Sequence, residues 1–308
     1  MQGKSVTCTV LLCTYNGAGY LEHQLRSLAD QTVEVINVHV SDDGSIDQTM
    51  EILHRWKREW TKGEFVVGNG PRQGFAENFR SLVLRVPQSD FYAFCDQDDF
   101  WHPDKLESAL RRLAPSADVA ALYGSRSVLV DGDGEPFGLS PMFPRPPSFN
   151  NALVQSLAAG NTMVLNRAGF ELLKESARRT RFLMHDWWAY LIISGAGGQV
   201  VYDHVPHLDY RQHRDNVLGG RISPAKRPGR LLELLRGKYV RWNDANLKAL
   251  DLCSDMLTPQ ARESVAALKA IRRANTVLSV VRLLRSGIYR QTRKGDVALA
   301  FAAFLHRL

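Results

Sequence analysis

The chain has 308 residues, of which 44% are hydrophobic and 23% charged. This is the composition of an ordinary soluble globular protein with one or two domains. The sequence contains no stretch of the roughly 18–20 apolar residues needed to cross a bilayer, which excludes a membrane-spanning protein. The four cysteines, Cys8, Cys13, Cys95 and Cys253, form no C-x-x-C pair. Three of them lie in or beside apolar strand-like runs, where a buried free thiol is expected, and this fits a reducing cytoplasm.

The net charge of +7 is unevenly distributed along the chain. Residues 221–308 hold 18 Lys and Arg against 6 Asp and Glu, a net +12, whereas residues 1–220 hold 21 against 26, a net −5. An acidic body with a basic tail suggests a polyanionic partner, such as anionic lipid, an anionic acceptor or nucleic acid. The first apolar run, 6–13, lacks a cleavage pattern, so we expect a core strand rather than a signal peptide.

Strand-like and helix-like patterns alternate through the first hundred residues. Short apolar runs between turn residues indicate strands, and apolar residues three and four apart indicate helices. We expect strands at 6–13, 33–40, 64–67 and 90–95, and helices at 20–29, 48–60, 76–85 and 103–113. This alternation predicts an α/β protein with a mostly parallel central sheet flanked by helices. Ligands of such sheets bind beyond the carboxyl ends of the strands.

The second half of the chain is less regular. We expect strand material at 119–130 and a long loop rich in proline at 134–151. A segment at 158–165 follows, to which we assign no element, and the remaining expected elements are helices beginning at 167 and 185, a short strand at 200–202, and helices from about 228 onward. The sequence therefore divides into residues 1–133, residues 134–220 and a basic, helical C-terminal extension, 221–308.

Polar clusters follow three of the predicted strands, at 14–16, 41–44 and 96–99. The last contains Asp96 and Asp98, which point to the same side if the strand continues through them. Such a pair can hold Mg²⁺ or Mn²⁺, whose coordination is usually completed by substrate phosphates. Alone the pair is equally typical of an acidic surface turn. Three clusters at strand ends favour a metal-dependent enzyme that acts on a nucleotide diphosphate.

Seven ordered motifs carry a resemblance to a known family. They are T-Y-N-G at 14–17, S-D-D-G-S-I-D at 41–47, G-F-A-E-N-F at 74–79, D-Q-D-D-F-W-H-P-D-K at 96–105, A-G-N-T-M at 159–163, H-D-W-W at 185–188 and Y-R-Q-H at 210–213. With them, about the first 220 residues resemble inverting nucleotide-sugar glycosyltransferases of family 2, which have the GT-A fold. The chain looks most like bacterial rhamnosyltransferases of lipopolysaccharide and surface-glycan assembly. The resemblance implies a Rossmann-like nucleotide-sugar-binding half, 1–133, and an acceptor-binding half, 134–220.

The resemblance also implies a set of donor-binding residues. Thr14, Tyr15 and Asn16 would hold the base and ribose, with Tyr15 stacking on the base, and Asp42 would accept the N3–H of a pyrimidine. Asp43 or Asp47 alternatively caps the following helix. Arg72 would reach a phosphate, unless it is a solvated loop residue, and Gly74 would allow close backbone approach. The rest of the donor set is Asn78, Asp96 toward the ribose, Gln97, and Asp99, which either contacts the sugar or orients its loop.

A metal and a general base complete the implied site. Asp96, Asp98 and His213 would hold the metal, although His204 and His207 lie nearby in sequence. Asp186 would be the base that takes the proton of the acceptor hydroxyl. Trp187 and Trp188 would bind the acceptor and raise the pKa of Asp186 by excluding water. Alternatively, Asp186 is a helix cap and both tryptophans belong to the core.

The C-terminal extension has two readings. Its apolar clusters, at 231–235 and 297–305, lie among Arg and Lys and could rest on an anionic membrane. They could equally pack on the body of the protein. We carry no site residue from the family into this region.

The sequence thus predicts an inverting glycosyltransferase. Its partners would be a dTDP- or UDP-sugar, with dTDP-L-rhamnose favoured, a divalent metal, and a glycan or glycolipid acceptor. It would be cytoplasmic or peripheral on the inner membrane. One alternative is a metal-dependent nucleotidyltransferase, but the loop at 14–19 lacks the basic residues that would bind a triphosphate. The other is a basic nucleic-acid-binding protein, which leaves the acidic motifs unexplained, so no nucleic acid is expected.

Overall fold

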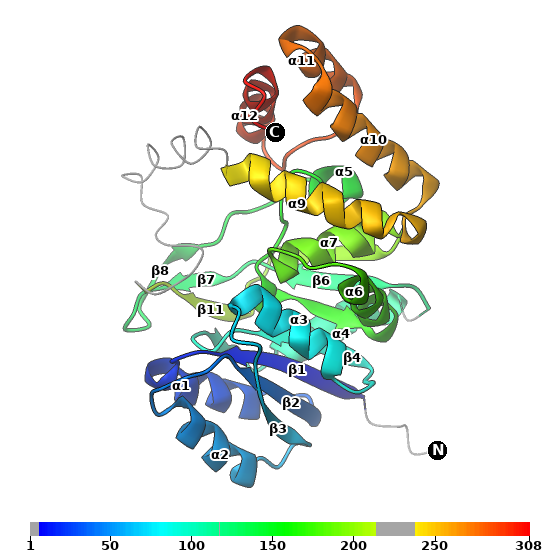
Figure 1. Ribbon diagram of the computed structural model, residues 1–308. Helices are drawn as coiled ribbons and strands as arrows, with labels where there is room; N and C mark the ends of the chain where they lie inside the picture. Colours follow the sequence, from blue (N-terminus) through cyan, green and yellow to red (C-terminus); the bar gives the residue numbers. More distant parts are fainter. Residues whose placement is uncertain (1–5, 117, 214–237) are drawn as a thin grey trace.

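A computed structural model describes residues 6–116, 118–213 and 238–308. At its centre is a sheet of seven strands in the order β10-β6-β9-β4-β1-β2-β3 (Figure 1). Its described strand pairs are parallel, except that β9 runs antiparallel to β4 and β6. The strands are β1 (Thr7–Thr14), β2 (Val35–Asp42), β3 (Phe65–Asn69), β4 (Phe91–Cys95), β6 (Ala121–Ser125), β9 (Val164–Asn166) and β10 (Gln199–Asp203).

Helices cover both faces of this sheet, because successive strand residues point to opposite sides. Val10 and Leu12 of β1 pack with α1, α2 and α4, whereas Leu11 and Cys13 pack with α3, α6 and α7. These helices are α1 (Ala18–Ala29), α2 (Thr49–Glu59), α3 (Phe75–Arg85), α4 (Lys105–Leu113), α6 (Arg167–Arg179) and α7 (His185–Gly195). The predicted α/β architecture is confirmed, and the elements expected up to residue 113 begin and end within two residues of their predicted bounds.

A smaller sheet lies at the side of the main one, in the order β5-β11-β7-β8. Its strands are β5 (Phe100–Trp101), β7 (Val128–Val130), β8 (Pro136–Leu139) and β11 (Leu208–Arg211). The strand material expected at 119–130 is therefore two strands in different sheets, β6 and β7. Between them the chain turns at Arg126, whose guanidinium donates to Ser140 O at 2.7 and 3.0 Å.

The loop expected at 134–151 is also partly wrong. It contains β8, which pairs with β7, and the short helix α5 (Phe149–Ala152), begun by Ser148 as N-cap. β8 gave no strand signal because its residues are exposed and therefore lack an apolar alternation. The segment 158–165 contains a 3₁₀ turn, η2 (Gly160–Thr162), followed by the start of β9.

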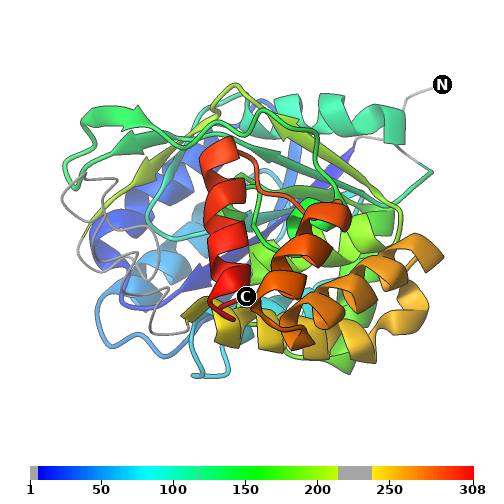
Figure 2. The ribbon, with the colours of Figure 1, turned by 90° about the horizontal axis from the view of Figure 1, so that it is seen from above.

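Four helices form the described C-terminal extension, as predicted: α9 (Lys238–Leu252), α10 (Pro259–Arg273), α11 (Thr276–Arg285) and α12 (Arg293–Phe304). They cover the α7 side of the molecule, with α11 and α12 farthest from the main sheet (Figure 1, and from above in Figure 2). Arg145 pairs with Asp296 at 2.7 Å, and Asn151 donates to Tyr289 O at 3.1 Å. The apolar cluster at 231–235 lies outside the described residues.

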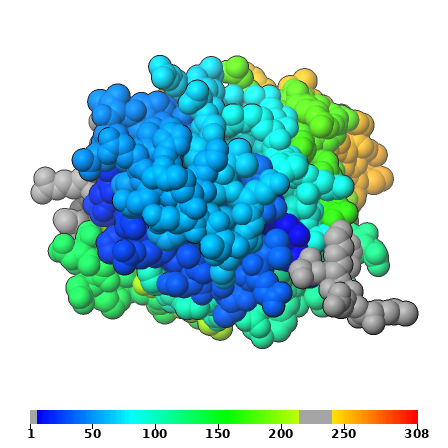
Figure 3. Space-filling model, turned by 90° about the horizontal axis from the view of Figure 1, so that it is seen from below, coloured from blue at the N-terminus to red at the C-terminus, as the bar shows by residue number. Residues whose placement is uncertain are grey.

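The buried free thiols expected at Cys8, Cys13 and Cys95 are confirmed, and Cys253 is also free and buried. None of the helices in the described ranges has the length and apolar character needed to cross a bilayer. The face opposite the C-terminal helices is formed mainly by the N-terminal part of the chain, coloured blue to cyan in Figure 3. The two ends of the molecule thus come from different parts of the sequence.

Candidate active site

The parallel register brings the three polar strand ends to one edge of the sheet. Thr14 at the end of β1 lies beside Asp42 at the end of β2, and Leu12 lies beside Cys95 at the end of β4. The Thr14 hydroxyl donates to Asp42 Oδ1 at 2.8 Å. The clusters predicted from sequence therefore form one continuous edge, as expected from strand polarity.

Gln97 joins two of these strand ends. Its side-chain carbonyl accepts from the N–H of Tyr15 at 2.8 Å, and its amide donates to Tyr15 O at 3.0 Å. These two hydrogen bonds resemble those between paired strands and lie just beyond the ends of β1 and β4. They use both the carbonyl and the amino group of the Gln97 side chain. The Tyr15 ring is left exposed at the edge, where a base can stack on it. Gln97 thus shapes the donor site through Tyr15.

The side chain of Asp42 does not have the role predicted for it. Oδ1 accepts from Thr14 and from the Ser45 hydroxyl at 2.5 Å, while Oδ2 accepts from the N–H groups of Gly44 at 3.1 Å and Ser45 at 2.8 Å. A carboxylate offers about four acceptor positions, and all are used within the protein. Because the residue is also buried, Asp42 organises the 42–45 loop rather than accepting a base N–H.

Asp43 binds the loop between β3 and α3 to the edge of the sheet where β2 ends. Its carboxylate accepts from the N–H of Arg72 at 2.6 Å and of Gly74 at 2.8 Å. Both residues have positive φ, 56° and 87°, so this turn is held in a conformation that favours glycine at residue 74. The exposed Arg72 side chain lies against Gly44. The N-cap of α2 is Gln48 rather than Asp43 or Asp47, although the Asp47 carboxylate, one residue earlier, accepts from Thr49 N at 3.0 Å.

Two further donor residues are buried and serve the scaffold. Asn78 donates to Ser41 O at 2.8 Å, which ties α3 to the end of β2. Asp99 accepts from Asn161 Nδ2 at 2.5 Å and from Arg211 N at 3.3 Å. Burial, then the charges of Asp98 and Asp96, raise the pKa of Asp99 well above its usual range. Of the two roles considered for Asp99, the structure favours orienting the loop, and direct donor contact by Asn78 is wrong.

The residues at 96–99 meet the end of β11. Asp98 Oδ2 lies 2.7 Å from His213 Nε2, and the His213 ring stacks on Tyr20 with centroids 4.8 Å apart. Arg211 donates to Asp98 O at 3.1 Å, and its guanidinium lies 5.2 Å from the Tyr20 ring. Of the three histidines considered, His213 is the one in contact with Asp98, whereas His207 pairs with Asp104 at 3.0 Å.

Asp96 is surrounded by negative charge. Burial raises its pKa to about 8, with further contributions from Asp98 and Asp186. Such a site favours a cation, which would restore the ionised carboxylate. No group of three or more His, Cys, Asp and Glu in the described ranges is arranged to hold a metal ion. Of the predicted three-residue metal set, the described structure brings Asp98 and His213 into contact.

Asp186 lies in the first turn of α7, where the helix dipole favours a negative charge. It is buried, and Oδ1 accepts from Trp187 N at 2.7 Å. Burial raises its pKa to about 6, although backbone hydrogen bonds from Trp187 and Gly160 lower it in part. The negative charge of Asp186 contributes to the raised pKa of Asp96, and the neighbouring rings of His185 and Phe94 lie 4.7 Å apart, so the start of α7 lies near the end of β4. A carboxylate with this pKa suits a general base near neutral pH.

His185, which precedes Asp186, has no function in our sequence interpretation. Its ring is buried, stacks on Phe79 at 3.9 Å and contacts Phe94 edge-on at 4.7 Å. Neither ring nitrogen has a hydrogen-bond partner among the described residues, and burial lowers its pKa to about 3. The Gly160 backbone packs directly on this ring. The neutral His185 ring thus packs the N-terminus of α7 against Phe79, Phe94 and the Gly160 backbone.

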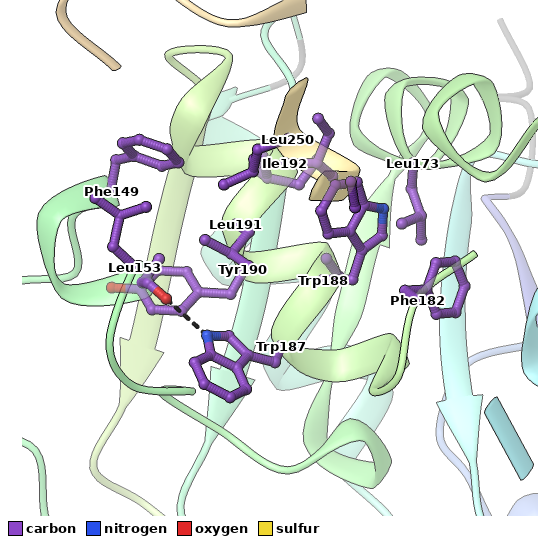
Figure 4. Packing of buried hydrophobic residues seen from close by; sticks show 14 of the residues in the cluster. Phe149, Leu153, Leu173, Phe182, Trp187, Trp188, Tyr190, Leu191, Ile192 and Leu250 are labelled. Atoms are coloured by element: carbon purple, nitrogen blue, oxygen red, sulfur yellow. Dashed lines mark hydrogen bonds between the residues drawn. The ribbon is translucent and has the colours of Figure 1, made fainter. Parts of the chain in front are cut away.

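The two tryptophans belong to the core. Trp188 is completely buried among Leu173, Phe182 and Leu250, and its indole N–H donates to Ser176 Oγ at 2.9 Å (Figure 4). Trp187 is nearly buried, and its N–H donates to Ala152 O at 2.6 Å. Neither presents an aromatic face to a sugar, so their predicted role in acceptor binding is wrong. Their effect is to anchor α7, and with it Asp186.

Sequence reasoning missed Tyr20, Asn161 and His185. Asn161 and His185 lie within the family motifs A-G-N-T-M and H-D-W-W. The sequence therefore marked both residues, but it could not show which residues their side chains contact. Tyr20 was hidden in an ordinary amphipathic pattern on α1. Each acts through a residue far away in sequence, Asn161 on Asp99 and Tyr20 on His213.

The family profile of glycosyl transferase family 2 matches residues 9–165, just over half of the chain, and the chain belongs to that family. The matched segment contains the three strand ends and Asp96 to Asp99. The protein is therefore a glycosyltransferase, and the nucleotidyltransferase and nucleic-acid-binding alternatives are set aside.

Among proteins of known name, the chain is 28% identical to the dTDP-rhamnosyl transferase RfbG of Shigella flexneri over 75% of this chain and 81% of that protein. It is 26% identical to TuaG of Bacillus subtilis, a putative teichuronic acid biosynthesis glycosyltransferase, over 59% of this chain and 71% of that one. The resemblance to rhamnosyltransferases seen in the motifs is thereby confirmed.

Solved structures confirm the GT-A fold. TarS of S. aureus, residues 1–349 with UDP-GlcNAc, has a TM-score of 0.55 at 16% identity, over 98% of this chain and 72% of that one. The mannosyltransferase PcManGT of Pyrobaculum calidifontis, with GDP-Man and Mn²⁺, has a TM-score of 0.51 at 17% identity, over 99% and 88%.

The packing of Gly160 on His185 generates a prediction. In Gly160→Ala, the added methyl group would collide with His185 Nε2 and displace the start of α7. We expect a loss of about 1–3 kcal/mol in the free energy of unfolding, measured by denaturant titration. Gly19→Ala is the matched control, because its methyl group would meet nothing within 4 Å and alanine favours the helix. Equal stability of both variants would contradict this packing.

Proposed function

We propose that this glycosyltransferase moves a deoxyhexose from a nucleotide diphosphate to a saccharide hydroxyl with inversion at the anomeric carbon. The observation that carries the proposal is the pairing of two acidic environments at one sheet edge. Asp98 with His213 suits a metal and diphosphate, while Asp186, with a pKa of about 6, follows His185, whose ring lies 4.7 Å from that of Phe94 near the end of β4. One part would bind the leaving group and the other would activate the attacking hydroxyl.

The favoured donor is dTDP-L-rhamnose. Its support is the relative named a dTDP-rhamnosyl transferase, matched over most of both chains. Tyr15 would stack on the base, with Thr14 and Asn16 shaping its pocket, and Arg72 would meet a phosphate. The acceptor would be a glycan or glycolipid of the lipopolysaccharide type, bound on the side of residues 134–220. The protein would work in the cytoplasm, or on the cytoplasmic face of the inner membrane.

Asp98 and His213 would hold Mg²⁺ or Mn²⁺, with Asp96 close by toward the ribose. When bound, the ion supplies Lewis-acid stabilisation of the departing diphosphate. Asp186 takes the proton of the acceptor hydroxyl as the hydroxyl oxygen attacks the anomeric carbon from the face opposite the nucleotide. The buried wall of α7 keeps the Asp186 carboxylate poorly solvated, which keeps it basic enough for this proton transfer.

A donor screen tests the proposal. Purified protein is incubated with UDP-, GDP- and dTDP-sugars, with and without Mg²⁺ or Mn²⁺, and nucleotide diphosphate release is measured. We expect turnover of dTDP-rhamnose that needs the metal, and little release from the other donors. Turnover of UDP-sugars alone would refute the donor, and turnover unaffected by a chelator would refute the metal.

Mutation should separate the contribution of Asp98, to donor binding, from the contribution of Asp186, to sugar transfer. Asp98→Asn should abolish metal-dependent binding of the donor, because it removes the carboxylate that contacts His213. Asp186→Asn should leave donor binding within about twofold but lower transfer by at least about a hundredfold, the usual contribution of a general base. Donor binding is measured by calorimetry and transfer by product formation. Asp118→Asn, an exposed change of the same kind, is the control and should alter neither.

The pH dependence of transfer follows from the pKa of Asp186. The base works only when ionised, so the rate at saturating donor and acceptor should be constant above about pH 6 and fall tenfold per unit below it. The decline begins about two units above the usual range of an aspartate because burial penalises the charged form. A rate that stays constant down to about pH 4.5 would mean that Asp186 is not the base.

A further inference from the structure

The outermost helices carry apolar residues on two opposite sides. On α12, Leu299, Ala302 and Ala303 face the protein and are buried. The other side presents Val297, 70% exposed, with Phe301 and Phe304, each 49% exposed. These three are spaced four and three residues apart, which places them on one helix face. Nothing in the packing of the described helices accounts for a second apolar stripe on α12.

The neighbouring helix α11 repeats the arrangement. Ser279 and Leu283 face inward, and the Ser279 hydroxyl donates to Ala303 O of α12 at 3.0 Å. On the outer side, Val277 and Leu284 are 71% and 75% exposed. The two helices lie together on the outer surface of the extension (Figures 1 and 2). We call the exposed residues Val277, Leu284, Val297, Phe301 and Phe304 the outer stripe.

Along the chain segment that carries the outer stripe, the charges are almost all positive. Residues 276–308 contain six Lys and Arg but one acidic residue, Asp296. The Asp296 carboxylate is already used, since it pairs with Arg145 at 2.7 Å and accepts from Arg290 N at 2.7 Å. The exposed basic residues of this segment are Arg282, Arg285, Arg293, Lys294 and Arg307. A partner of this surface must therefore be apolar where it meets the stripe and anionic around it.

We propose that α11 and α12 are the surface through which the protein lies on an anionic lipid membrane. Amphipathic helices bind such interfaces by burying apolar side chains at the level of the head groups while Lys and Arg meet the lipid phosphates. A second copy of the chain fits less well, because a symmetric pairing of this face would place like charges opposite each other. Membrane binding would bring the enzyme to the proposed glycolipid acceptor, so its biological purpose rests on the proposed function. Its test does not, because membrane binding can be measured without any transfer reaction.

Membrane binding is measured by flotation with vesicles, without donor or acceptor. Wild-type protein should bind vesicles of phosphatidylethanolamine and phosphatidylglycerol, should bind pure phosphatidylcholine weakly, and should be released by salt. This assay does not measure sugar transfer. A protein that fails to bind vesicles would therefore leave the proposed transferase function intact, and a protein that fails to transfer sugar would leave the vesicle-binding result intact.

Two double variants test the surface separately. Arg293→Gln with Lys294→Gln should weaken binding to anionic vesicles about 30-fold, from about 1 kcal/mol per charge. Val297→Ser with Phe301→Ser should weaken it at least about tenfold and leave the salt dependence in place. The matched control is Lys57→Gln with Arg58→Gln, an exposed basic pair on α2 at the opposite end of the molecule. It should bind like wild type, and thermal melting confirms that each variant is folded.

Three outcomes would overturn the inference. The first is wild-type protein that does not float with anionic vesicles. The second is equal loss of binding in the α2 control, which would indicate net charge rather than this surface. The third is a dimer in sedimentation that the Val297 and Phe301 changes dissociate while vesicle binding is unaffected, which would make the outer stripe a contact between copies of the chain.

Discussion

The concentration of carboxylates at one edge of a parallel sheet is the constraint on which the rest of this structure depends. Parallel register brings the ends of β1, β2 and β4 together, and with them Asp42, Asp43 and the acidic residues of 96–99. Buried like charges repel, so each must be neutralised, hydrogen-bonded or matched by a cation. The protein does this in two ways. Backbone and amide N–H groups serve Asp42, Asp43 and Asp99, while Asp96 and Asp98 retain a need for positive charge.

The acidic residues look alike in sequence, but this difference in hydrogen bonding divides them into carboxylates that hold the loops in place and carboxylates proposed to act in the reaction. The carboxylates saturated by N–H groups set the shape of the loops around the nucleotide site. In the proposed function, Asp96, Asp98 and Asp186 are instead the carboxylates that would serve a metal, a diphosphate and a proton. The apolar packing of Trp187 and Trp188 matters to this arrangement because it fixes α7, although neither ring touches a substrate surface.

Much of the fold could be predicted because its signals are local. Apolar periodicity and turn residues located the elements up to residue 113, and strand polarity placed the three polar clusters at one edge. β8 was missed because an exposed edge strand carries no apolar alternation. In the site, the contact of Asp98 with His213 agrees with the expectation of a shared metal role, which is itself still a prediction. Asp42, Asn78 and both tryptophans were assigned ligand contacts that burial and hydrogen bonding contradict.

The alternation of strands and helices, the acidic strand ends and the basic tail were determined by sequence alone, since periodicity and charge are properties of neighbouring residues. Family membership also rests on sequence, through motifs whose order is legible without a structure. Only the tertiary structure decided which carboxylates are occupied and which are available. The partners that decide it, such as Asn161 for Asp99 and His213 for Asp98, lie 62 and 115 residues away along the chain. Burial likewise appears only when α7 is packed, and it is burial that moves Asp186 into the range of a working base.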